Sequence, residues 1–146
     1  MNFDALDKVA TLARSRENKA AGQLQEQRQV LDESSSRLTQ LESFKREYEE
    51  RLEALSRTGM DARQLAGYRQ FLANLNDAIR LQTRQVSHGE AELELRREAF
   101  LGHNQRRSSV EELISRGRAD LLREEARLEQ RQSDENSLGR YGRGPA

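Results

Sequence analysis

The chain has 146 residues, of which 34% are hydrophobic and 34% are charged, and its 25 basic and 25 acidic residues cancel to zero net charge. This composition holds too little apolar volume for a compact core, so it excludes an ordinary globular domain and leaves a long helical assembly or disorder. The balanced charge does not favour nucleic acid as a partner, and the lack of cysteine excludes disulfides and thiolate chemistry.

Helix is favoured over disorder because the sequence contains few helix breakers. Its single proline is Pro145, and the dominant residues are leucine, alanine, glutamate, glutamine and arginine, which are good helix formers. The sequence contains no apolar run long enough to cross a membrane, and its first residues lack the apolar segment of a signal peptide. We therefore expect a cytoplasmic helical protein without direct membrane insertion.

The first predicted element is a long helix over residues 3–57. From Phe3 onward, apolar residues recur at alternating steps of three and four as far as Leu55. Twelve of the sixteen positions on this path are apolar. Such spacing keeps one stripe of a helix facing a partner helix, and it is typical of a coiled coil.

A short turn is predicted next, over residues 58–61. Gly59 can adopt the left-handed conformation that ends a helix. Asp61 is a favourable N-cap, and Gln64 three residues later completes a capping-box pattern. Because so few residues separate the two helices, we expect them to pack against each other as antiparallel neighbours.

The second predicted helix covers residues 62–131 and is the longer of the two. Its apolar path runs from Leu65 to Leu128, with twelve of nineteen positions apolar. Residues 133–146 are rich in turn formers, and we expect them to form a disordered tail. The predicted fold class is therefore all-α, with residues 1–132 forming two long helices in an antiparallel coiled-coil hairpin.

The hairpin also predicts which residues face each other. Glu17 is expected to face His103, and this polar pair could fix the register of the two helices. The residues beyond Arg118 extend past the start of the first helix and carry the exposed leucines Leu121, Leu122 and Leu128. This end either frays or docks into a partner, and the sequence leaves both interpretations open.

Two phenylalanines fall beside the predicted seam rather than within it. Phe44 and Phe71 both occupy heptad position g, and in an antiparallel pair the g positions of the two helices share one flank. They are expected to lie together near the turn. They either widen the core or form an exposed patch that binds a partner, and the lack of a second packing layer favours the patch.

The sequence shows no pattern that indicates an enzyme. It contains no metal-binding, phosphate-binding or nucleophile motif, and a two-helix structure offers no cavity in which carboxylates could be desolvated. The two histidines are interpreted as surface residues, and the basic stretch "HNQRRSSV" as a solvated helix face. We therefore expect no catalytic residues, no cofactor and no metal.

The order of these parts resembles the FliJ family, the small coiled-coil proteins of the bacterial flagellar type III export apparatus. The resemblance covers nearly the whole chain. It rests on an N-terminal "FDALDKVATLARSREN", a first helix with "KAAGQLQEQ", a glycine-containing turn and the segment "YRQFLANLNDAI". It implies an antiparallel two-stranded coiled coil similar to the central stalk of rotary ATPases.

The resemblance also implies partners and sites. The end that carries both termini would insert into the export ATPase hexamer, and a flank near the turn would bind the cytoplasmic domain of the export gate protein. The gate-binding positions of the family fall on eight residues, namely Arg37, Leu41, Phe44, Tyr48, Phe71, Leu75, Ala78 and Gln82. Arg37 and Gln82 depart from the family pattern, which has glutamine and histidine there, and Phe44 replaces a tyrosine.

The surface facing the ATPase is predicted from position along the hairpin alone. It comprises the basic residues nearest the end with both termini, namely Lys8, Arg14, Arg16, Arg118, Arg123 and Arg127. The implied setting is cytoplasmic, at the periphery of the inner membrane, with export chaperones as further partners and a monomeric free state. Two alternatives remain open at this stage, a stalk protein of an injectisome-type secretion system and a self-associating coiled-coil adaptor.

Overall fold

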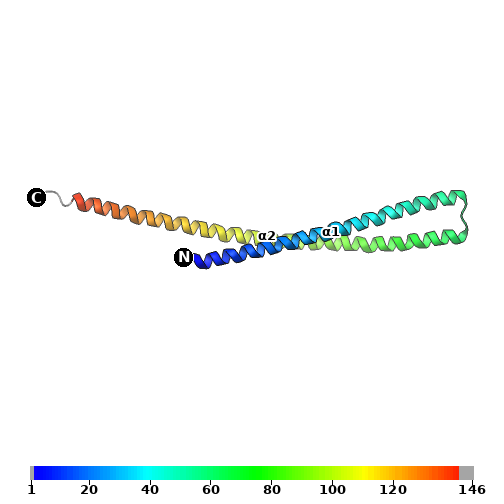
Figure 1. The fold of residues 1–146 in the computed structure, drawn as a ribbon, viewed down its shortest axis with the longest axis horizontal. Helices are drawn as coiled ribbons and strands as arrows, with labels where there is room; N and C mark the ends of the chain where they lie inside the picture. Colours follow the sequence, from blue (N-terminus) through cyan, green and yellow to red (C-terminus); the bar gives the residue numbers. More distant parts are fainter. Residues whose placement is uncertain (1, 142–146) are drawn as a thin grey trace. The chain divides into compact units, whose positions relative to one another are not determined.

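The computed structural model describes residues 2–141 as two helices joined by a short connection (Figure 1). Helix α1 spans Phe3–Thr58 and helix α2 spans Ala62–Tyr141. No strand is present among these residues. The all-α prediction is confirmed, as is the prediction that the second helix is the longer.

Both helices begin with a side-chain cap. The Asn2 Oδ1 accepts a hydrogen bond from the Ala5 N–H at 3.2 Å, a cap that the sequence pattern had not indicated. At the start of α2 the Asp61 Oδ1 accepts one from the Gln64 N–H at 2.7 Å, as predicted. Gly59 ends α1 with a φ of 93°, a conformation that costs glycine little because it lacks a Cβ.

The chain divides into two compact units. The hairpin unit comprises residues 18–101, and the terminal unit comprises residues 1–17 with residues 102–146. In the hairpin unit the second part of α1 and the first part of α2 run antiparallel on either side of the connection (Figure 1).

The predicted seam of the hairpin unit is confirmed by burial. Every position on the apolar path from Ala20 to Leu52, and from Leu65 to Phe100, is buried or half-buried. The best-covered apolar side chains are Ala20, Leu24 and Leu75. Since no side chain is fully buried, two helices without a further layer provide a seam rather than a closed core.

In the terminal unit, the first residues of α1 pair with the middle of α2. The buried apolar residues here are Ala13 and Ile114. The predicted polar pair of Glu17 and His103 forms no hydrogen bond. Glu17 instead accepts hydrogen bonds from Asn104 and Arg107, because these side chains carry donors that reach its carboxylate across the helix pair.

The end of α2 also differs from the prediction. The helix continues past Arg131 to Tyr141, through part of the segment predicted to be a tail. Proline is absent from this stretch, and the Gln130 side chain donates a hydrogen bond to Asp134 one turn later at 3.1 Å, which supports the helix. The rest of the predicted tail, residues 142–146, lies outside the described residues.

Candidate functional site

Three aromatic rings gather near the connection of the hairpin unit, on the flank where binding was predicted. We call Tyr48, Tyr68 and Phe71 the aromatic patch. Tyr48 of α1 stacks on Phe71 of α2 with ring centroids 4.3 Å apart and an interplanar angle of 29°. Its ring also meets Tyr68 at 6.2 Å in a tilted geometry. One α1 ring therefore holds two α2 rings in place across the seam.

The aromatic patch is open to solvent. Phe71 is 42% exposed although it is a large apolar side chain, while both tyrosines are half-buried. The three rings line a shallow groove together with Gln64 and Gly67 of α2. Gly67 presents no side chain, so the groove reaches the α2 backbone, and a ligand can approach the rings from that side.

A positive charge lies on the rim of this groove. The Arg51 guanidinium is 5.8 Å from the centroid of the Tyr48 ring, within the range of a cation–π contact. Sequence reasoning did not assign Arg51 or Tyr68 to the site. Both could have been found from their positions, because Arg51 lies one turn after Tyr48 and Tyr68 one turn before Phe71.

Phe44 lies on the surface near this patch but is not part of its ring stack. It is 53% exposed and lines a separate shallow groove with Gln40, Ser43 and Glu47, all on α1. Among residues 2–141 the aromatic ring pairs are those made by Tyr48. Phe71 therefore meets α1 at Tyr48, not at Phe44 as the heptad positions had suggested.

The eight gate-binding positions differ widely in accessibility. Three are exposed, namely Arg37, Phe44 and Phe71. Three are half-buried along the seam, namely Leu41, Tyr48 and Ala78. The remaining two, Leu75 and Gln82, are only 8% and 9% exposed and belong to the seam itself.

The burial of Gln82 has a local cause. Its amide Nε2 donates to the backbone oxygen of Ser34 at 2.8 Å and to the Ser34 Oγ at 2.9 Å. Ser34 is also buried, so the two polar side chains satisfy each other inside the seam. This arrangement favours a structural role for Gln82 in holding the two helices together.

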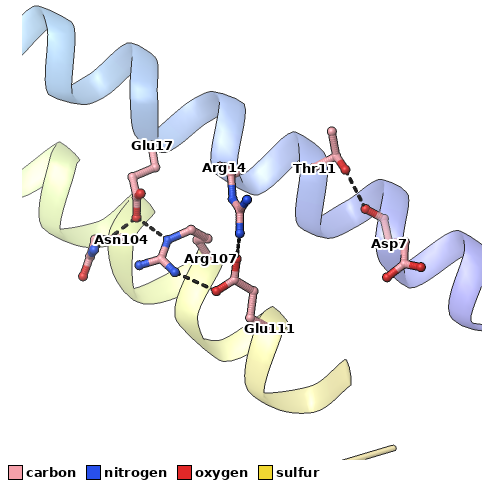
Figure 2. A network of polar contacts seen from close by, with 7 residues as sticks. All are labelled: Asp7, Thr11, Arg14, Glu17, Asn104, Arg107 and Glu111. Carbon is pink, nitrogen blue, oxygen red and sulfur yellow. Dashed lines mark hydrogen bonds and ion pairs between the residues drawn. The ribbon is translucent and has the colours of Figure 1, made fainter. Parts of the chain in front are cut away.

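A second candidate site, made of charged and polar side chains, lies in the terminal unit (Figure 2). We call Arg14, Glu17, Asn104, Arg107 and Glu111 the ionic cluster. The Arg107 Nε donates to Glu17 at 2.6 Å and its Nη1 donates to Glu111 at 2.7 Å. Arg14 donates to the other oxygen of Glu111 at 2.6 Å. Each helix thus contributes one arginine and one glutamate to a chain of contacts in which positive and negative charges alternate.

The ionic cluster shifts the pKa of two of its members, Glu111 and Arg107. Hydrogen bonds from Arg14 and then Arg107 hold the pKa of the Glu111 carboxyl below its ordinary value. The hydrogen bond to Glu17 raises the pKa of the Arg107 guanidinium above its ordinary value. Because the pKa of Glu111 is lowered in the folded state, its stabilising contribution is present above the ordinary carboxyl pKa and is lost as the pH falls through the folded value.

The six basic residues predicted to face an ATPase are all exposed, and three of them are paired. Arg14 belongs to the ionic cluster, and Arg123 contacts Asp120 on its own helix at 3.4 Å. Arg118 donates to Asp7 at 3.1 and 3.2 Å and lies 5.7 Å from the centroid of the Phe3 ring. Within residues 2–141, Lys8, Arg16 and Arg127 make no ion pair.

Neither helix of the described residues has a stretch long and apolar enough to cross a membrane. The fold defines a protein of two long helices that pair as an antiparallel coiled coil, with an aromatic patch and an ionic cluster along them. The family model of the flagellar FliJ protein matches residues 1–146, so the chain belongs to the FliJ family. None of the curated proteins compared with the chain matches it. Membership implies that the chain is a component of flagellar protein export.

Proposed function

We propose that the chain acts as the central stalk of the export ATPase ring and links that ring to the cytoplasmic domain of the export gate protein. Family membership supports the export setting, and the antiparallel pairing of two helices supports the stalk role. The single observation that carries the link to the gate is the aromatic patch. Its Phe71 ring is held by Tyr48 yet stays 42% exposed, as expected of a contact prepared for a partner.

The proposed mechanism involves binding and no bond-making. The two helices of a pair present different side chains, so a pair lying on the axis of a ring gives the surrounding subunits unequal contacts. Unequal contacts favour different conformations in different subunits, which is how a stalk can promote assembly and activity of a ring. Export chaperones are proposed as further partners, and the inner-membrane periphery at the flagellar base is the proposed location.

Hydrolysis of ATP by the flagellar export ATPase of the same organism tests the stalk role. We expect stimulation that saturates near one copy of this chain per hexamer, because a ring has one axis. The rate should be measured with the chain absent and then titrated over a wide concentration range. Unchanged hydrolysis over that range would falsify the stalk role and leave a coiled-coil adaptor.

The link to the gate is tested separately by the Phe71→Ala variant. Removing a central aromatic contact is expected to weaken binding of the gate domain by about 1–3 kcal/mol. The matched control is Leu95→Ala, because Leu95 is also an exposed apolar residue of α2 in the hairpin unit but lies outside the aromatic patch. Equal binding by both variants and the wild type would remove the aromatic patch from the proposal.

The flagellar family match favours the flagellar setting over the injectisome alternative. Self-association has one observation in its favour, the four exposed leucines of α2 that follow Arg118, which are Leu121, Leu122, Leu128 and Leu138. They belong to residues 120–139 of α2, all of which are exposed, and the C-terminal part of α2 continues beyond the start of α1 (Figure 1). The mass of the free chain separates this second candidate from a monomeric stalk.

A further inference from the structure

The two units hold their helices together by different chemistry. Among residues 2–141, the ion pairs that cross from α1 to α2 are Arg14–Glu111, Glu17–Arg107 and Asp7–Arg118, and all three lie in the terminal unit. In the hairpin unit the ion pairs join residues of one helix, for example Lys45–Glu49 and Arg96–Glu92. The polar contacts that cross its seam are hydrogen bonds between uncharged groups, donated by the side-chain amides of Gln27 and Gln82.

The apolar seam is correspondingly weak in the terminal unit. On α1 it is formed by Phe3, Leu6, Ala10 and Ala13 before it reaches the charged Glu17. In the hairpin unit the same helix contributes five leucines, namely Leu24, Leu31, Leu38, Leu41 and Leu52. Since each buried methylene contributes roughly 0.8 kcal/mol, replacing leucine by alanine along a seam removes a large part of its hydrophobic stabilisation.

We propose that residues 3–17 of α1 form an ionic strap, which is released from α2 when its ion pairs are screened while the hairpin unit stays paired. Release uncovers Val110 and Ile114, which lie on the same seam of α2 as the exposed Leu121 and Leu128. The strap therefore controls how much of the apolar stripe of α2 is accessible. This inference does not depend on the proposed stalk role.

The three ion pairs are expected to respond to salt in a fixed order. The Asp7 and Arg118 side chains are both more than half exposed, so salt screens their attraction readily. The Glu17 and Arg107 side chains are only 15% and 24% exposed, and Asn104 donates to the same glutamate at 3.0 Å (Figure 2). We therefore expect this inner pair to be the last to separate as the salt concentration rises.

Amide hydrogen exchange followed by mass spectrometry tests the strap in the intact chain. Raising sodium chloride from about 0.1 M to about 1 M shortens the screening length from about 10 Å to about 3 Å. We expect exchange of the amides in residues 5–17 to accelerate at least several-fold, while amides in residues 27–52 keep their rates. Equal acceleration in both segments, or none in either, would overturn the proposal.

Two variants distinguish the effect of the ionic cluster from the effect of losing one positive charge anywhere nearby. Arg107→Gln removes the guanidinium that joins Glu17 to Glu111, whereas Arg106→Gln removes the adjacent exposed arginine, which makes no ion pair within residues 2–141. We expect faster exchange of residues 5–17 only in Arg107→Gln, already at low salt. If Arg106→Gln has the same effect, net charge rather than the ionic cluster holds the segment.

Exchanging the charges of the outer pair provides a second, independent measurement. Asp7→Arg and Arg118→Asp each place like charges opposite each other, so each alone should accelerate exchange of the strap. The two substitutions combined restore opposite charges and should restore most of the protection. Failure of the double variant to recover would show that the side chains act through packing and not through their ion pair.

Discussion

At the scale of single residues, neighbouring positions of α2 have opposite roles. Phe71 stacks on Tyr48 at the surface, whereas Leu75, one turn later, lies in the seam and is 8% exposed. Phe71→Ala is expected to lower the free energy of unfolding by less than Leu75→Ala, because it loses about 0.5–1.5 kcal/mol of aromatic pairing and the burial of only part of its ring. Leu75→Ala should cost about 2–5 kcal/mol because it leaves a cavity.

Urea unfolding followed by circular dichroism at 222 nm measures both changes. The helix content of Phe71→Ala in the absence of urea should match that of the wild type, which also validates its use in the gate-binding test. If Phe71→Ala proves as damaging as Leu75→Ala, then Phe71 is part of the core and its exposed fraction has no functional meaning.

Residue-scale roles could be predicted from the sequence only where the repeat decides them. The heptad position predicted that Phe44 and Phe71 would be exposed, and both are. The repeat also placed Gln82 and Ser34 on the seam, but it could not predict that the Gln82 amide donates to Ser34, because this bond depends on which side chains meet across the helix pair. The partners of Glu17 were missed for the same reason, since Asn104 and Arg107 reach it across the helix pair.

At the scale of the helices, two glycines differ in how much space surrounds them. A Cβ added at Gly22 in α1 meets nothing within 4 Å, whereas one added at Gly89 in α2 lies 3.2 Å from the Leu31 Cδ1. Gly22→Ala is therefore expected to stabilise the chain by about 0.5–1 kcal/mol through helix propensity alone. Gly89→Ala gains the same propensity but overpacks the seam, which typically costs about 1–3 kcal/mol.

The midpoint of urea unfolding ranks these two variants directly. We expect Gly22→Ala to unfold at a higher urea concentration than the wild type, and Gly89→Ala at the same or a lower one. A gain for both would show that Leu31 moves aside without cost. A loss for Gly22→Ala would mean that α1 requires a glycine there for a reason other than packing.

The helices themselves could be predicted well, but one of their ends could not. Propensity, spacing and the capping residues placed the connection to within about a residue, because Gly59 and Asp61 act locally. The helix α2 extends farther than predicted. The turn-forming residues near Ser133 do not end it, and no proline occurs before Pro145. Local composition alone does not end a helix.

At the scale of the whole molecule, the antiparallel pairing is explained by two apolar paths that cover each other within one chain. Both apolar paths are covered as far as Leu52 on α1 and Gly117 on α2, so a second copy is not needed to bury them. The sequence could predict this pairing because the turn is short and the two paths are in register. It could not predict that charge replaces apolar contact in the terminal unit, since that depends on which side chains meet.

The last leucines of α2 decide the oligomeric state. Leu121, Leu128 and Leu138 continue the heptad path, but the positions between them are Glu124, Arg131 and Glu135. Charged residues are depleted in the cores of stable interfaces, so a stripe in which they alternate with leucine is poorly suited to hold two copies together. We therefore expect sedimentation equilibrium at micromolar concentration to give the mass of one chain. A dimer that dissociates in the Leu121→Ser, Leu128→Ser double variant would instead establish self-association through this end.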